Sequence, residues 1–404
     1  MTSEQRTPAR RRVVVAPSGQ SSWDATTTDA FAAVPESSAS LDDVLAWAVE
    51  VGTRIPLPGS GRTLERWEFL ASVAAHDVGT SRILEPHLDA IAILIEARSE
   101  DVEHPRSPAR GGSRSRADSG AESQVVDTVE RLLDATANGA SWGVFASGGA
   151  ASTLAATQHG DEWRLTGRKP WCSLGAVLSH ALVTASTPSG DSRLFAVDLG
   201  QDGVRAHTGP WIARGLREVV SAPIDFDGVR ATPVGAEGWY LARPGFAWGG
   251  MGVAACWFGG AVGVARALSE TWTHREPDAL HDAATGAIDV LLQTSGGMLG
   301  SAASIIDRGA SASATSHGSR AEPEQESLSV SPSILMKRVR GAVAPSVATI
   351  IERVQRVLGP GPSTTDEAFA KRVADLQLYL AQHHWERDDV SLGRGLRALG
   401  RSPW

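Results

Sequence analysis

The sequence has few cysteines, few lysines and no apolar run long enough to cross a membrane. Its two cysteines, Cys172 and Cys256, form no Cys-x-x-Cys pair and no disulfide framework, so a reducing, cytoplasmic compartment is expected. The longest uncharged apolar stretch, residues 249–265, is shorter than the roughly 20 residues that a membrane span needs. We therefore expect a buried helix there and no membrane partner.

An excess of positive charge is also missing. The chain carries 46 acidic and 38 basic residues, a net charge of −8, which argues against nucleic acid as a partner. Hydrophobic residues make up 42% of the 404 residues and charged residues 21%, near the average for a soluble globular protein. This composition excludes a fibre or a wholly disordered chain, and the length suggests two or three domains.

Three segments lack the large apolar side chains that a core needs. They are rich in Ser, Arg, Gly or charged residues, and they cover residues 1–38, 98–125 and 308–331. Burial of so few apolar groups cannot offset the entropy lost on ordering the chain, so all three are expected to be disordered. The first would be a leader, and the other two would be insertions into folded domains.

Between these segments the hydrophobic pattern changes twice. Residues 39–138 show amphipathic helical spacing, opened at Ser40 and Asp43 by a pair typical of a capping box. Residues 139–245 hold short apolar or alternating runs separated by Gly and Asp, which favour an antiparallel sheet. Helical spacing then covers four long stretches, residues 246–272, 278–307, 332–358 and 366–399. The sequence therefore predicts an α+β multidomain protein, with an N-terminal α-helical domain, a middle antiparallel β-barrel or sandwich, and a C-terminal four-helix bundle over residues 246–404.

Four segments resemble characteristic stretches of one family, in the family's order. They are residues 161–173 (DEWRLTGRKPWCS), 211–227 (WIARGLREVVSAPIDFD), 243–263 (RPGFAWGGMGVAACWFGGAVG) and 358–388. Together with the order of helical block, β block and helical bundle, they resemble the acyl-CoA dehydrogenase superfamily of flavoproteins. The resemblance covers residues 39–399 apart from the two insertions, and it implies the fold of that family.

The resemblance also implies a bound FAD and a set of residues around it. Trp171 takes the position of the tryptophan that lies against the flavin ring, and Ser173 that of the hydroxyl near the reactive N5. Trp142 and Val144 keep the apolar character of a second flavin-binding stretch, where backbone donors need no particular side chain. Arg275 is what remains of a motif that reaches the flavin diphosphate from a neighbouring subunit. The alternatives are a packing role for Trp171 and a solvated loop position for Arg275.

The catalytic carboxylate of the family's dehydrogenases is missing from its usual places. Counting from Asp375 and Tyr379, its position falls on His383, and residues 246–266 contain no Asp or Glu. An imidazole with an ordinary pKa of about 6.5 can act as a base near neutral pH, so His383 is the candidate catalytic residue. Glu386 is expected on the same helical face, where it could orient the ring. The alternative is a histidine on the helix surface.

The resemblance implies an FAD-dependent oxidoreductase that oxidises the CH–CH bond of an acyl thioester such as acyl-CoA and passes electrons to a soluble acceptor. A flavin monooxygenase of the same superfamily and a non-catalytic scaffold paralogue are the alternatives, because neither needs the carboxylate. A homodimer or homotetramer is expected, as in the family. No metal site is expected, since His274 and His281 are followed by no third ligand at a suitable spacing.

Overall fold

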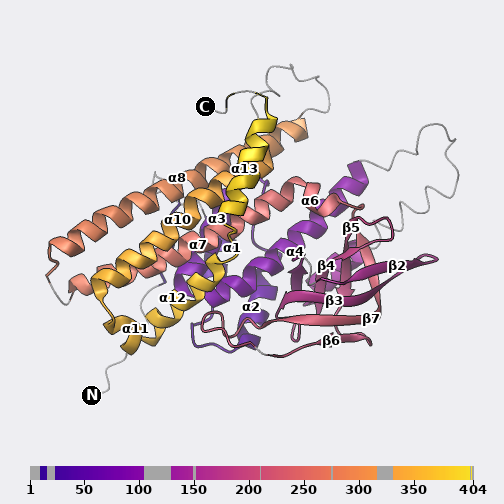
Figure 1. Cartoon of the computed structure of the whole chain (residues 1–404), viewed down its shortest axis with the longest axis horizontal. Helices are drawn as coiled ribbons and strands as arrows, with labels where there is room; N and C mark the ends of the chain where they lie inside the picture. The colour runs from indigo at the N-terminus through magenta and orange to yellow at the C-terminus, as the bar shows by residue number, and fades with distance from the viewer. Residues whose placement is uncertain are drawn as a thin grey trace. The chain divides into compact units, whose positions relative to one another are not determined.

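Figure 1 shows a computed structural model of the chain, which describes residues 10–15, 23–103, 129–148, 152–209, 211–273, 276–315, 331–400 and 402. The chain divides into two compact units, and we describe each by itself. The helical unit comprises Met1–Ala39, Pro56–Ser81 and Gly250–Trp404, and the sheet unit comprises Ser40–Ile55 and Arg82–Gly249. The division into three domains at residues 39, 139 and 246 stays a prediction.

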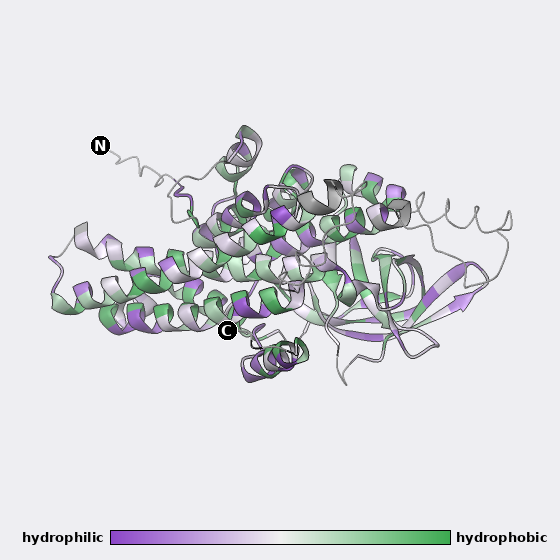
Figure 2. Cartoon of the chain, turned by 90° about the horizontal axis from the view of Figure 1, so that it is seen from above, coloured by the Kyte–Doolittle hydropathy of each residue, from purple (hydrophilic) through white to green (hydrophobic). Residues whose placement is uncertain are grey.

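Long helices fill the C-terminal part of the helical unit, as the four stretches of helical spacing predict. The helices of this unit are α1 (Ala25–Ala32), α3 (Thr63–His76), most of α7 (Pro244–Glu270), the 3-10 turn η1 (Thr271–Thr273), α8 (Ala279–Thr315), α10 (Pro332–Leu358), α11 (Gly361–Thr365), α12 (Glu367–Leu380) and α13 (Glu386–Ala398). Figure 2 shows apolar and polar residues alternating along the long helices, which is the pattern that buries one face of each. Helix α10 packs against both α8 and α12.

Contrary to the expectation from the stretch 249–265, helix α7 is long and apolar enough by length and composition to cross a membrane, but most of it is enclosed by protein. In its most apolar window of 18 residues, 72% of the residues are buried inside the structure. Its small residues let a neighbouring helix approach closely, since Gly259 lies against the backbone of Ala71 in α3. The burial agrees with a core helix.

Two expectations for the helical unit are wrong. The stretch at 366–399 is not one helix: α12 ends at Leu380, α13 begins at Glu386, and Trp385 between them has a left-handed φ of 46°. A left-handed residue cannot continue an α-helix. Glu386 therefore opens a new helix and does not share a helical face with His383.

The predicted disorder of residues 10–15 and 23–38 is the other, while residues 1–9 and 16–22 of that leader lie outside the described part of the chain. Residues 10–15 and 23–38 are ordered, because a few apolar side chains, Val13, Val15 and Phe31, are buried in this unit. The backbone N–H of Val13 donates to Ser72 Oγ at 2.8 Å and anchors the segment on α3. Helices α4 and α8 also reach into the other two predicted disordered segments, whose remaining residues, 104–125 and 316–330, lie outside the described part of the chain.

The sheet unit places helices α2 (Leu41–Gly52), most of α4 (Val78–Glu103) and α6 (Trp239–Ala242) with a seven-stranded sheet. Residues 129–137 are also helical. The capping box at the start of α2 is confirmed: Ser40 Oγ accepts from the Asp43 N–H, and the Asp43 carboxylate accepts from the Ser40 N–H. Helix α4 buries Ile93 and Leu94 in one core with side chains of three strands, Trp142, Leu182 and Leu194.

The strands are β1 (Trp142–Phe145), β2 (Ala155–His159), β3 (Glu162–Ser173), β4 (His180–Ser186), β5 (Ser192–Asp198), β6 (Val204–Ala206) and β7 (Ser221–Val234). They are ordered β1-β4-β2-β3-β7-β5, with β6 beside β7 and an additional pairing of β4 with β5. Most pairs are antiparallel as predicted, but β4 runs parallel to β1 and to β2, which corrects the expectation of a purely antiparallel sheet. The barrel or sandwich form of the sheet stays a prediction.

Candidate functional site

The end of strand β3 presents an exposed indole. Trp171 is 63% exposed and has a left-handed φ of 59°, and the register of β3 against β7 shifts between Lys169 and Cys172. Such a bulge breaks the alternation of side chains and redirects one of them out of the sheet. The ring at this position is free to stack on a flat ligand, whereas a core tryptophan would be buried.

Lys169 anchors the strand next to the bulge. Its Nζ donates to both the carbonyl oxygen and the hydroxyl of Thr184 on β4, each at 2.8 Å, and the side chain is only 2% exposed. Burial lowers the pKa of Lys169 to about 8, because the charged form loses its hydration. These two bonds fix the position from which the bulge and Trp171 project.

Ser173, two residues beyond Trp171, belongs to a hydrogen-bond cluster between α4, β3 and β7. Arg82 Nη2 donates to Ser173 Oγ at 3.1 Å, and Ser173 Oγ lies 2.8 Å from Ser221 Oγ. The Arg82 guanidinium also lies 3.7 Å from Glu85 Oε2, and these two side chains are mostly buried. The hydroxyl that the resemblance assigns to the flavin N5 is therefore held in place by groups from two other elements, α4 and β7.

Trp142 and Val144 lie on β1, and the indole of Trp142 is not available to a ligand. It is 1% exposed, and its Nε1 donates to Thr136 Oγ1 at 2.9 Å. Its backbone N–H donates to His87 Nδ1 at 3.2 Å. Trp142 therefore packs in the core of the sheet unit, while Val144 is half-buried beside it.

Residues from α4, β1 and β3 nevertheless meet around one small cavity. Its lining includes Arg82, Pro86, Trp142, Val144 and Ser173. Three residues that the sequence assigned to flavin binding, separated by up to 31 positions, are thus neighbours in space. Arg82 is a member that sequence reasoning missed. The signal for it was the i, i+3 spacing of Arg82 and Glu85 on helix α4.

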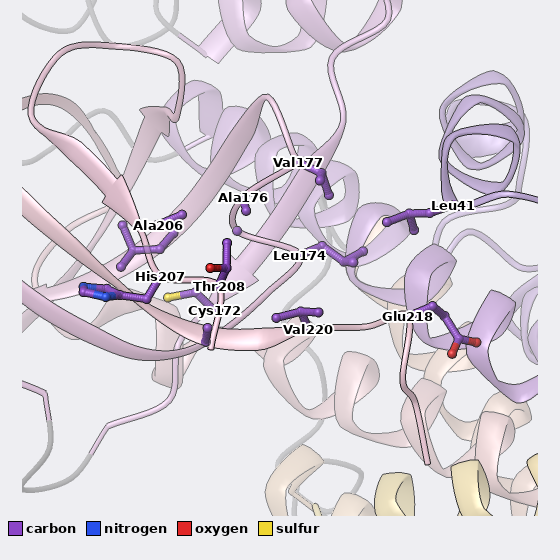
Figure 3. Close-up of a pocket in the computed structure, with 13 residues that line it drawn as sticks. Leu41, Cys172, Leu174, Ala176, Val177, Ala206, His207, Thr208, Glu218 and Val220 are labelled. Carbon is purple, nitrogen blue, oxygen red and sulfur yellow. The ribbon is translucent and has the colours of Figure 1, made fainter. Parts of the chain in front are cut away.

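The opposite side of the β3 end faces an apolar crevice of about 220 Å³ (Figure 3). Cys172, Leu174 and Val220 line it together with Leu41 from α2. Burial raises the pKa of the Cys172 thiol to about 12, so this sulfur is a packing group and not a nucleophile. Trp171 is not among the residues that line this crevice.

His383, in the helical unit, is buried and not on a helix surface. It lies in the turn after α12, is 4% exposed, and its ring meets Trp257 and Trp385 edge-on at centroid distances of 6.1 and 5.0 Å. Its Nδ1 is 3.1 Å from Asp388 Oδ2, without the alignment of a hydrogen bond. Loss of hydration is the main cause that lowers the pKa of His383, which keeps the ring neutral near pH 7.

The structure does not describe the remaining positions that the sequence assigned to the site. Arg275 lies outside the described residues, as do residues 149–151 of the second flavin-binding stretch. In the part of the chain that the structure describes, no group of three or more His, Cys, Asp or Glu is arranged to hold a metal ion.

No protein-family model and no curated protein matches this sequence. Solved structures do match, over almost their whole length. KijD3 in complex with FMN and a dTDP-linked sugar has a TM-score of 0.68 and 19% identity, over 94% of this chain and 93% of that one. TdsC from Paenibacillus sp. A11-2, with FMN and indole, has a TM-score of 0.66 and 16% identity, over 94% and 96%. Butyryl-CoA dehydrogenase from Megasphaera elsdenii has a TM-score of 0.68 and 12% identity, over 93% and 99%.

This chain has the acyl-CoA dehydrogenase fold. The resemblance drawn from four short segments is therefore confirmed for the architecture. The acyl-CoA dehydrogenase fold is shared here by proteins described as a dehydrogenase, a dibenzothiophene monooxygenase and a nitrososynthase, so the fold alone does not select a reaction.

Proposed function

We propose that this protein is a flavin-dependent monooxygenase that acts on a small molecule. The observation that carries the proposal is the end of β3, where an exposed indole stands two residues before a hydroxyl that Arg82 and Ser221 hold in place. An apolar ring face covers a flavin and excludes water, and a fixed hydroxyl can meet its N5. These residues fit the ring of a flavin.

The polar groups that would hold the second half of FAD are mostly missing. The motif that reaches the flavin diphosphate keeps only Arg275, and Ala151 and Ser152 replace the Ser and Asp of the other flavin-binding run. FMN has a single phosphate and no adenosine, so it needs fewer of these contacts. The KijD3 and TdsC structures that match this chain contain FMN. We therefore favour FMN over the FAD that the resemblance implies.

Oxygen chemistry fits the proton-transfer groups better than desaturation of a thioester does. Removal of an α-proton needs a strong base, and residues 246–266 offer no carboxylate. His383, which takes the position of that carboxylate, has a pKa lowered by burial and is a weaker base than an ordinary histidine. A reduced flavin supplies the two electrons with which oxygen places one atom in the substrate and one in water. The role assigned to His383 is to hold or pass on a proton at its imidazole.

The first test is flavin binding by the purified protein. Titration with FMN and with FAD, followed by quenching of flavin fluorescence, is expected to show tighter binding of FMN. Trp171→Ala should weaken binding at least about tenfold, because it removes the ring that covers the flavin. Trp163→Ala on the same strand, where the ring contacts Phe195 and Arg193, is the matched control and should leave binding unchanged. A protein that binds neither flavin would be a scaffold and would overturn the proposal.

The second test separates the two reactions. Oxidised flavin on the protein is expected to keep its colour when butyryl-CoA is added without oxygen. Reduced FMN and oxygen are expected to convert a small aromatic probe, indole, to an oxygenated product that mass spectrometry detects as a gain of 16 mass units, the mass of one oxygen atom. Bleaching by butyryl-CoA, with no oxygenated indole, would instead establish the acyl-CoA dehydrogenase reaction.

A further inference from the structure

A chain of hydrogen bonds at the end of β3 fixes the direction of the Ser173 hydroxyl. Ser173 Oγ lies 2.8 Å from Ser221 Oγ, and Ser221 Oγ donates to the Val219 carbonyl at 3.1 Å. A carbonyl oxygen only accepts, and a serine has a single hydroxyl hydrogen. The hydrogen of Ser221 is therefore already used. The hydrogen shared by the two hydroxyls must come from Ser173.

Arg82 completes this assignment from the other side. A guanidinium carries only donors and stays protonated, so Ser173 Oγ accepts the hydrogen bond from Arg82 Nη2. The Arg82 side chain is 14% exposed and is held near Glu85 at 3.7 Å. Ser173 thus gives its hydrogen to Ser221, accepts one from Arg82, and keeps one further lone pair with which it can accept.

We propose that Arg82 and Ser221 are positioning residues that hold the Ser173 hydroxyl as an acceptor, so that the protein binds reduced flavin in preference to oxidised flavin. The inference rests on the proposed function, in which Ser173 meets N5. This nitrogen carries a hydrogen in reduced flavin and only a lone pair in oxidised flavin. An acceptor oxygen gains a hydrogen bond with the reduced form and none with the oxidised form, where two lone pairs face each other.

The experiment compares the dissociation constants of oxidised FMN and of FMN reduced with dithionite, both without oxygen. The wild-type protein is expected to bind reduced FMN at least about tenfold more tightly, which corresponds to a rise of about 30 mV in the potential of the two-electron couple. Ser221→Ala lets the Ser173 hydrogen turn toward oxidised N5, so the ratio should fall to about one. Arg82→Met lets Ser173 rotate and should lower the ratio at least about threefold.

Arg98→Met is the matched control. Arg98 lies on the same helix and pairs with Glu130 at 3.3 Å on the surface, so its loss should leave the ratio unchanged. In a Ser173→Ala background, Arg82→Met should cause no further change, because the arginine acts through the hydroxyl.

The outcomes distinguish the inference from the proposed function. A wild-type ratio in both Ser221→Ala and Arg82→Met, with FMN still bound, overturns the inference and leaves the proposed function standing. If Arg82→Met lowers the ratio further when it is added to Ser173→Ala, the arginine does not act through the hydroxyl, and its positioning role is overturned. Wild-type protein that binds neither redox form overturns the proposed function and the inference with it. Ser221→Ala removes one oxygen atom, so it keeps the test decisive if Arg82→Met does not fold.

Discussion

At the scale of single residues, the sheet unit depends on a histidine that must stay neutral. His87 on α4 is 3% exposed, and its Nδ1 accepts the backbone N–H of Trp142. Gly52 of α2 lies so close that a Cβ there would be 2.5 Å from His87 Nε2. Burial lowers the pKa of His87 to about 4. Protonation would cost both the hydrogen bond and the hydration of a charge, so the neutral ring is part of the fold.

The pH dependence of stability should report this residue. Because the folded pKa is about 4 and the unfolded pKa about 6.5, the stabilisation is complete above pH 6.5 and is lost as the pH falls from 6.5 to 4. Because of His87, the free energy of unfolding of the wild-type protein should be about 2 kcal/mol lower at pH 5 than at pH 7.5. His87→Asn keeps an acceptor and does not titrate. Urea unfolding of wild type and variant at both pH values measures the difference, and parallel pH dependences would contradict the assignment.

At the scale of elements, the contact of α7 with α3 depends on a residue without a side chain. A Cβ at Gly259 would lie 2.0 Å from the Ala71 carbonyl oxygen and 2.5 Å from its Cα. The atoms in the way are backbone, so no rotamer can relieve the clash, and the two helices would have to separate. The spacing of small residues in the apolar stretch 249–265 is therefore a packing device.

Gly259→Ala should lower the free energy of unfolding by about 3 kcal/mol, because overpacking forces the backbone of both helices to shift. Gly286→Ala on α8 is the control. A Cβ at Gly286 meets nothing within 4 Å, so alanine should stabilise the helix by about 0.5–1 kcal/mol. Chemical denaturation of the two variants gives opposite signs if the contact is as close as described. Equal stabilities would rule it out.

At the scale of the whole molecule, residues 12–15 and Trp23, which precede α1, are bound to helices α3 and α7 by hydrogen bonds. Their backbone and side chains supply donors to a buried carboxylate: Glu68 Oε1 accepts from the Val15 N–H at 2.9 Å, and Glu68 Oε2 from Trp23 Nε1 at 3.0 Å. Glu68 is 1% exposed. Arg266 of α7 donates to the carbonyl of Arg12 at 2.9 Å and holds the same segment from another helix.

Deletion of residues 2–24 should therefore lower the unfolding free energy by at least about 3 kcal/mol, since the buried Glu68 side chain would lose two donors. Glu68→Met in the shortened chain should recover part of the loss, because it removes the buried polar group that has lost its donors. The denaturant midpoints of the full chain, the shortened chain and the double variant decide the matter. A shortened chain as stable as the full one would show that the leader is dispensable.

Local patterns predicted much of the fold because helices and strands depend on neighbouring residues. The capping box at Ser40, the helical spacing of α3 and α10, and the short apolar runs of β1 and β5 were all legible in the chain. Strand β2 carries no such signal, because only one of its five residues is buried and no apolar alternation results. The break at Trp385 has no sequence signal, because residues 381–385 contain neither Gly nor Pro.

The candidate site was predicted only in part, because its members come from distant segments. The order of residues along the chain is enough to place Trp171 and Ser173 two apart at the end of a strand, and to show that no carboxylate lies in the apolar helix after the sheet. The hydrogen bond from Arg82, 91 residues earlier, to Ser173 and the burial of the Trp142 indole arise only in the folded protein. Spacing along the chain controls local conformation, whereas the direction of a hydroxyl and the pKa of an imidazole depend on groups that folding brings together.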